Sequence, residues 1–162
     1  MVVWLCVIIA ASSAPLQTRP AIAGRVGNAA VHRDIVITSD CVHTVGFGSA
    51  DGDRLAFSTG PEFVIRLSNG RELTTADYRP QSPQLPAALT GSLSIPLVPL
   101  RAGDPLVTLE FVADENLPVI RKRITVDSQE VVDWIDVEAL TTDAVTDLGG
   151  FGQPLFLNNR WF

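Results

Sequence analysis

With 162 residues, the chain is long enough for one domain of ordinary size with a sizeable hydrophobic core. Hydrophobic residues make up 46% of it and charged residues 19%, a globular composition that excludes a disordered or low-complexity protein. The formal net charge is −6 and the arginines are scattered, so the chain lacks the basic surface of a nucleic-acid-binding protein. We therefore expect no nucleic-acid partner.

The N-terminal residues 1–23 are typical of a signal peptide. Residues 2–11 form an apolar run that is too short to cross a bilayer, which takes roughly 20 residues. A polar, proline-containing stretch follows, and Ala21-Ile22-Ala23 has the small-x-small form of a cleavage site. No lysine or arginine precedes the apolar run, so an N-terminal strand or a misplaced start site is the alternative. The pattern predicts an exported protein, secreted or periplasmic, without a stable membrane span after processing.

From residue 24 to residue 162, the chain predicts a single all-β domain. Short runs that alternate polar and apolar residues are separated by turn residues, and these runs lie at 31–38, 42–47, 55–57, 63–68, 93–97, 107–111 and 120–126. Asn69-Gly70 predicts a tight hairpin, because both residues tolerate a positive φ. Regularly spaced short strands are typical of an antiparallel sandwich of two sheets. No alternation of strands and helices is visible, which argues against a dinucleotide-binding fold.

Prolines predict where this pattern is interrupted. Residues 79–91 carry three prolines, a density that predicts a surface connection rather than a strand. Pro96 and Pro99 restrict the strand that contains them to the edge of a sheet, or break it, because proline has no backbone N–H to donate.

In two later segments that have strand character, a polar residue falls on a face that is otherwise apolar. In 120–126, Lys122 falls on the same face as Ile120 and Ile124, so its amine must extend to the surface or find a carboxylate partner. Lys122 is also the single lysine of the chain.

Residues 128–143 fit either a helix capped by Ser128 or a strand. As a strand, Val131, Ile135, Val137 and Ala139 share a face, and Asp133 is the misplaced polar residue. The β-branched residues of this segment favour the strand.

Carboxylates are the one plausible catalytic resource of the chain. On a strand, Asp136 and Glu138 would share a face roughly 7 Å apart, and glycoside hydrolysis uses two carboxylates about 5 to 10 Å apart. In a chain with 18 acidic residues, however, such a pair usually lies on a solvent-exposed face. A small glycoside hydrolase that uses Asp136 and Glu138 is therefore a distant alternative, and we assign no catalytic residue.

His32, Asp40, Cys41 and His43 contain ligand types that zinc prefers. Their spacing has neither the i,i+4 form of a helical site nor a Cys-x-x-Cys pair, so we expect no metal and no cofactor. Signal-peptide cleavage would remove Cys6 and leave Cys41 without a disulfide partner. We therefore interpret Cys41 as a small buried hydrophobic residue.

Aromatic residues supply the candidate ligand or partner surface. Trp161 and Phe162 end the chain, and they either complete a sheet or pack against a neighbour that follows; we favour the neighbour. Arg160 beside them can donate hydrogen bonds to a hydroxyl or a carboxylate. For Trp134 we favour packing in the core, with a platform for a sugar ring as the alternative.

Three stretches carry a family resemblance: Leu117 to Asp127 with its Arg-Lys-Arg-Ile-Thr-Val run, Asp133 to Glu138, and Gly-Phe-Gly-Gln-Pro-Leu-Phe at 150–156. Together they resemble the N-terminal β-sandwich of large secreted glycoside hydrolases of the α-galactosidase and raffinose-synthase kind. The stretch 61–73 also looks like paired strands of such a domain. The resemblance covers roughly residues 30–162.

The resemblance implies that the catalytic carboxylates lie on a downstream (β/α)₈ barrel, to which nothing in this chain corresponds. No catalytic residue can therefore be carried over to this sequence. It predicts a non-catalytic accessory domain of an exported carbohydrate-processing enzyme, or a truncated relative of one, with the barrel as its partner. The alternative is a free-standing carbohydrate-binding or adhesion module.

Overall fold

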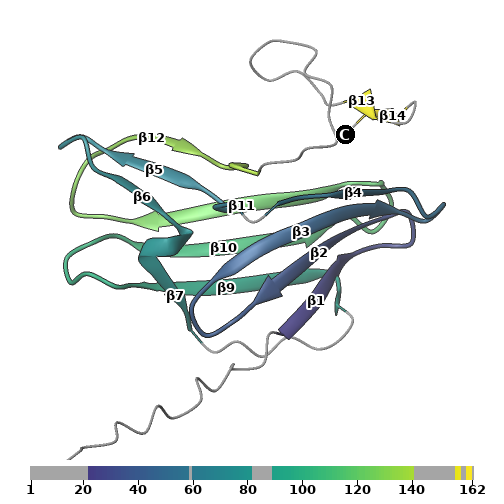
Figure 1. Cartoon of the computed structure of the whole chain (residues 1–162), viewed down its shortest axis with the longest axis horizontal. Coiled ribbons are helices and arrows are strands. Elements are labelled where there is room, and N and C mark those ends of the chain that lie inside the picture. The colour runs from purple at the N-terminus through teal and green to yellow at the C-terminus, as the bar shows by residue number, and fades with distance from the viewer. Residues whose placement is uncertain (1–21, 59, 82–88, 141–155, 158–159, 162) are drawn as a thin grey trace, which may run out of the picture.

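In the part of the chain that the structure describes, the regular elements are β-strands, apart from one 3₁₀ turn (Figure 1). The computed structural model describes residues 22–58, 60–81, 89–140, 156–157 and 160–161. Its elements are β1 (Ile22–Gly27), β2 (Val31–Ile37), β3 (Val42–Ser49), β4 (Arg54–Ala56), β5 (Val64–Leu67), β6 (Glu72–Thr74), the 3₁₀ turn η1 (Thr75–Asp77), β7 (Tyr78–Pro80), β8 (Leu89–Thr90), β9 (Ser92–Pro99), β10 (Leu106–Ala113), β11 (Ile120–Asp127), β12 (Val132–Asp136), β13 (Phe156–Leu157) and β14 (Arg160–Trp161).

Three sheets build the body of the fold, in the orders β4-β3-β2-β1-β8, β11-β10-β9-β7 and β12-β5-β6. Strands β13 and β14 form a separate antiparallel pair. Neighbouring strands within the sheets are antiparallel, apart from β1 and β8, which run parallel. Contacts of β1 with β10 and of β2 with β11 bring the five-stranded and four-stranded sheets face to face. The all-β antiparallel sandwich that the sequence predicts is confirmed, but three sheets build it in place of the predicted two.

The core lies between these sheets and follows the two-residue period of the strands. In β10, Val107, Leu109 and Phe111 are at most 1% exposed, while Thr108 and Glu110 lie on the other face. Each side chain buried in this way contributes about 1.5–3 kcal/mol. The buried hydrophobic residues come from all three sheets: Val26, Ile35, Ile37, Val42, Phe63, Ile65, Leu67, Leu73, Tyr78, Ile95, Leu97, Val107, Leu109 and Phe111. The alternation in 31–38, 63–68 and 107–111 predicts one apolar face for each run, and these faces are the buried ones in β2, in β5 with the residue before it, and in β10: Ile35 and Ile37; Phe63, Ile65 and Leu67; Val107, Leu109 and Phe111.

The predicted Asn69-Gly70 hairpin connects β5 to β6. Gly70 has a φ of 86°, a left-handed conformation that glycine adopts without strain. The Leu67 N–H donates to the Arg71 carbonyl at 2.9 Å and closes the turn. This turn fixes the register in which Ile65 lies opposite Leu73 in the core.

The prediction that the prolines confine β9 to a sheet edge is wrong, because β9 lies between β10 and β7. The Pro96 carbonyl accepts a hydrogen bond from the Gln81 N–H at 2.8 Å, just beyond the end of β7. In an antiparallel pair, the N–H and the carbonyl of one residue point to the same side. The N–H that Pro96 lacks would therefore point toward Gln81, one residue beyond the end of β7. Its absence removes no hydrogen bond from the β7–β9 pairing itself, so the sheet tolerates proline at this position.

The proline-rich segment 79–91 is also less irregular than predicted at its two ends. Arg79 and Pro80 belong to β7, and Leu89 and Thr90 form β8 beside β1. Residues 82–88 lie outside the described part of the chain.

The strand predicted in 128–143 exists as β12, but its buried face differs from the expectation. The register with β5 shifts between Val132 and Trp134, as in a β-bulge. Because a bulge adds one residue to one strand, Val132 and Ile135 both pack against the core, whereas Val131 is 70% exposed. The predicted face, with Val131, Ile135 and Val137 together, is wrong for this reason.

Strand β1 begins at Ile22, and the Ala23 backbone pairs with Val36 of β2. The predicted signal-peptide cleavage after Ala23 would therefore remove the first two residues of β1. Residues 1–21 lie outside the described part of the chain. Within the described part, no helix is long and apolar enough to cross a membrane.

Candidate functional site

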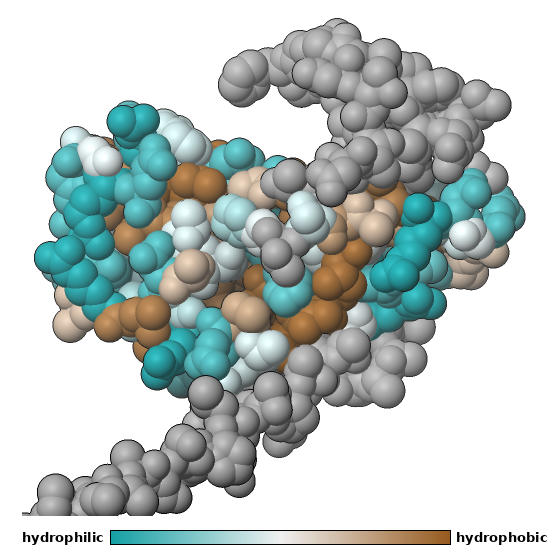
Figure 2. Space-filling view, viewed as in Figure 1, coloured by the Kyte–Doolittle hydropathy of each residue, from teal (hydrophilic) through white to brown (hydrophobic). Residues whose placement is uncertain are grey.

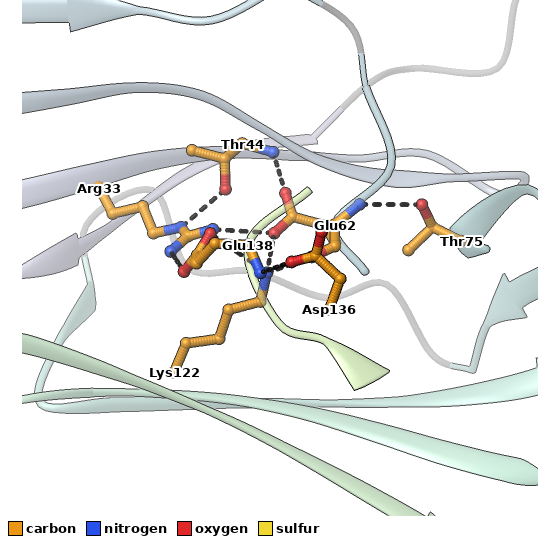
Figure 3. A network of polar contacts seen from close by, with 7 residues as sticks. All are labelled: Arg33, Thr44, Glu62, Thr75, Lys122, Asp136 and Glu138. Atoms are coloured by element: carbon orange, nitrogen blue, oxygen red, sulfur yellow. Dashed lines mark hydrogen bonds and ion pairs between the residues drawn. The ribbon is translucent and has the colours of Figure 1, made fainter. Parts of the chain in front are cut away.

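Four charged side chains meet between the sheets and form a cluster (Figure 3): Arg33 of β2, Glu62 just before β5, Lys122 of β11 and Glu138 just beyond β12. The side chains of Arg33, Glu62 and Lys122 are 2%, 0% and 3% exposed, whereas that of Glu138 is 43% exposed. Since these residues come from three different sheets or their ends, the charge cluster ties the whole sandwich together.

Arg33 is the centre of the charge cluster. Its guanidinium donates two hydrogen bonds to the Glu138 carboxylate, from Nη1 to Oε1 at 2.7 Å and from Nη2 to Oε2 at 3.1 Å. Nη2 also donates to Glu62 Oε2 at 2.8 Å, and Nε donates to Thr44 Oγ1 at 2.7 Å. Every nitrogen of the guanidinium therefore has an oxygen partner, which a buried arginine requires.

Two aromatic rings cover the cations of the cluster. The Arg33 guanidinium lies 4.6 Å from the centroid of the Phe111 ring and 4.9 Å from that of Phe47. The Lys122 amine lies 5.8 Å from the Phe111 centroid. The negative face of an aromatic ring attracts a cation, so Phe111 stabilises both charges while it separates them from water.

Glu62 is the fully buried anion of the cluster. Its Oε2 accepts from Lys122 Nζ at 2.8 Å, and its Oε1 accepts from the backbone N–H of Thr44. Its own backbone N–H donates to Thr75 Oγ1 at 3.1 Å, and its carbonyl accepts from Lys122 Nζ at 2.5 Å. Burial acts to raise the pKa of the Glu62 carboxyl, but Lys122, Arg33 and the hydrogen bonds outweigh it and lower this pKa. Glu62 is thus a carboxylate at neutral pH.

We expect the free energy of unfolding to fall as the pH drops below about 4.5. The Glu62 carboxyl has a pKa below its ordinary value of 4.5 in the folded protein, so its charge stabilises the fold above that pH. The contribution is lost as the pH falls through the folded pKa, because both states are then protonated. Urea unfolding between neutral and acidic pH measures this decline. The Glu62→Gln variant should show a shallower decline, and a slope equal to that of the wild type would contradict the assignment.

The sequence anticipated part of this cluster. It predicts that Lys122 either extends to the surface or finds a carboxylate partner, and the structure shows the second outcome, with Glu62 as the partner. Arg33 was missed, although it lies two residues before Ile35 and so shares the inward face of β2. Glu62 carried no such signal, since it precedes β5 and lies in no alternating run.

The two carboxylates that were considered for catalysis do not share a strand face. Strand β12 ends at Asp136, and Glu138 lies beyond it. Asp136 Oδ1 accepts the backbone N–H of Glu138 at 3.1 Å, while the Glu138 carboxylate turns toward Arg33 and Lys122. The predicted shared face is therefore wrong, and Glu138 is an ion-pair partner in the charge cluster.

A second feature lies on the outward face of β12, β5 and β6. Trp134 is 41% exposed, so the expectation that it packs in the core is wrong; the bulge after Val132 turns it outward. Trp134 lies opposite Arg66, and Arg66 lies opposite Glu72. Both Arg66 and Glu72 are exposed, with Nη1 and Oε1 3.7 Å apart. We call these three residues the Trp134 strip.

The other candidates from the sequence are placed only in part. Arg160 and Trp161 form β14, in which Trp161 pairs with Phe156 and Arg160 with Leu157. Phe162 lies outside the described residues. The expectation that these residues face a partner stays a prediction.

In the part of the chain that the structure describes, the possible zinc ligands belong to no group of three or more His, Cys, Asp or Glu side chains arranged to hold a metal ion. Cys41 is half-buried rather than buried, with Sγ 3.2 Å from Thr38 Oγ1 and 3.7 Å from His43 Nδ1. Together with Pro61 and Thr75, it lines an open, mainly apolar hollow of about 460 Å³.

On the face shown in Figure 2, hydrophilic residues surround a band of hydrophobic ones.

Comparison of the chain with known protein families, with curated proteins and with solved structures finds no match. The structure defines the chain as an antiparallel β-sandwich with a buried charge cluster and an exposed surface feature, the Trp134 strip. The resemblance to the N-terminal sandwich of α-galactosidase-like enzymes stays a prediction.

Proposed function

We propose that this chain is a non-catalytic β-sandwich module that binds carbohydrate through the Trp134 strip. The observation that carries this proposal is the exposed indole of Trp134, aligned with Arg66 and Glu72 across three strands of an open sheet face. The apolar face of a sugar ring packs on an aromatic ring, and charged neighbours exchange hydrogen bonds with its hydroxyls.

The geometry of the strip suits an extended ligand. Adjacent strands lie about 4.8 Å apart, so the backbones that carry Trp134 and Glu72 are about 10 Å apart. Neighbouring rings of one oligosaccharide can therefore contact the indole and the carboxylate together. Arg66 lies between them and offers hydrogen-bond donors to the same ligand.

The state of Glu138 supports a binding role over hydrolysis. A catalytic carboxylate must have an oxygen free to meet the substrate. Both oxygens of Glu138 accept hydrogen bonds from Arg33, and Oε2 also lies 3.5 Å from Lys122 Nζ, so neither oxygen is free. The proposal therefore sets aside hydrolysis by Asp136 and Glu138.

Export and an accessory role belong to the same proposal. The apolar run and small-x-small motif within residues 1–23 support export as a secreted or periplasmic protein. The resemblance to α-galactosidase-like enzymes supports a downstream catalytic barrel as the partner, with Arg160, Trp161 and Phe162 on the facing side.

Replacing Trp134 with Ala should weaken carbohydrate binding about tenfold or more, because an exposed aromatic anchor often carries much of the binding energy. Affinity electrophoresis against a panel of neutral and charged polysaccharides measures this change. Trp134→Phe should keep part of the affinity, since it keeps a ring. Leu100→Ala is the matched control, because Leu100 is also exposed, at 56%, but lies outside the strip. No retention of the wild type on any polysaccharide, or equal retention of Trp134→Ala, would refute the proposal.

A further inference from the structure

Independently of carbohydrate binding, we propose that Arg33 and Lys122 form a carboxylate-binding site, which Glu138 occupies in this structure and which a small carboxylate ligand can take over by displacing Glu138. The site consists of two buried cations whose second anion comes from an exposed residue outside the strands.

The charges of the buried residues require a second anion. Arg33 and Lys122 carry two positive charges and Glu62 carries one negative charge, so the three buried side chains leave one positive charge uncompensated. An uncompensated charge in a protein interior is costly. Glu138 supplies the missing negative charge, and any other carboxylate at the same place would do so as well.

The geometry around Glu138 is that of a ligand in a prepared site. The Arg33 guanidinium presents two parallel N–H groups, a fork that matches a carboxylate in both spacing and direction. The guanidinium also donates from Nε to Thr44 and from Nη2 to Glu62, and neither of these hydrogen bonds involves Glu138. The fork therefore keeps its orientation when Glu138 leaves.

Glu138 can leave without disrupting the sandwich. It lies two residues beyond the end of β12, so its withdrawal breaks no strand pairing. Its side chain is 43% exposed, whereas that of Glu62 is fully buried. Of the two anions in the cluster, Glu138 is the one that a ligand from solution can reach and replace.

The ligand class is a small carboxylate, either a simple organic acid or an acidic sugar. In the wild type, the tethered Glu138 competes at an effective concentration in the millimolar range or above. We therefore expect the Glu138→Ala variant to bind acetate at least about tenfold more tightly than the wild type does. Thermal unfolding with increasing sodium acetate, against sodium chloride at matched ionic strength, measures the affinity as a saturable rise in Tm.

Three comparisons make this experiment decisive. Glu130→Ala removes an exposed carboxylate outside the cluster, which hydrogen-bonds Asn69, and should respond to acetate as the wild type does. The double variant Glu138→Ala, Lys122→Met should lose the acetate response. Glucuronate in place of acetate distinguishes the ligand sources: tighter binding of glucuronate assigns the site to acidic sugars, and tighter binding of acetate assigns it to simple organic acids.

A second measurement applies if Glu138→Ala does not fold. Because Lys122 is the single lysine, mass spectrometry after treatment with an amine-reactive reagent reports how often its 3%-exposed side chain becomes accessible. In Glu138→Gln, which preserves the side-chain size, Lys122 should react faster than in Glu130→Gln, and acetate should slow the reaction. No saturable effect of acetate on either variant, or the same effect with chloride, would overturn the proposal.

Discussion

Replacing Glu62 with Gln should lower the free energy of unfolding by about 3–5 kcal/mol, the usual cost of removing one partner of a buried ion pair. Glutamine keeps the size of the side chain but removes the fully buried negative charge of the cluster. Arg33 and Lys122 are then left with the half-exposed Glu138 as their only anion in the cluster. Urea unfolding at neutral pH measures the difference between the variant and the wild type.

Two further variants show whether this loss comes from the charges. Glu130→Gln changes an exposed carboxylate and should alter the stability by no more than about 0.5 kcal/mol. Adding Lys122→Met to Glu62→Gln removes one of the stranded cations and should restore part of the lost stability. A change below about 1 kcal/mol for Glu62→Gln would mean that water reaches the cluster and that its charges are not buried.

Replacing Phe111 with Ala should also cost about 3–5 kcal/mol, the range for removing a large aromatic side chain from a core. Phe111 is fully buried in β10, between β9 and β11. Its ring also covers the Arg33 guanidinium and the Lys122 amine, so the substitution opens a cavity beside two charges. Chemical unfolding of the variant measures the combined loss.

Phe111→Leu helps to separate the two contributions. Leucine fills much of the space but offers no ring, so its loss combines the cation–π contacts, up to about 2 kcal/mol, with a smaller packing contribution than in the alanine variant. Val112→Ala is the neighbouring control, because Val112 points to the opposite face of β10 and is 38% exposed. It should change the stability by well under half the loss in Phe111→Ala. Equal losses in the two alanine variants would contradict the described packing.

The sequence predicts the faces of β2, β5 and β10 correctly because a strand exposes and buries alternate residues. It fails at Trp134, because a bulge adds one residue to the strand, and alternation alone does not indicate where this occurs. It also fails for β9, where the position of Pro96 relative to a short neighbour decides whether a missing N–H matters. Both features depend on strand pairs that a single strand does not specify.

The charge cluster shows the same division between local and long-range information. The inward position of Lys122 follows from its own strand, and so do the two outcomes open to its amine, which are extension to the surface or a carboxylate partner. The identity of that partner does not, because Glu62 lies 60 residues away, in a segment outside any strand. The Trp134 strip likewise requires the register of three strands before its residues are seen to be neighbours.

The long sequence separations in the cluster also determine when it can form. Arg33 and Glu138 are 105 residues apart, and Arg33 and Glu62 are 29 apart, so their pairing must follow the closure of long loops. Until the three sheets have met, the cations remain hydrated and contribute nothing to assembly. We therefore expect the ion pairs to form late in folding and to act mainly by slowing the opening of the finished sandwich.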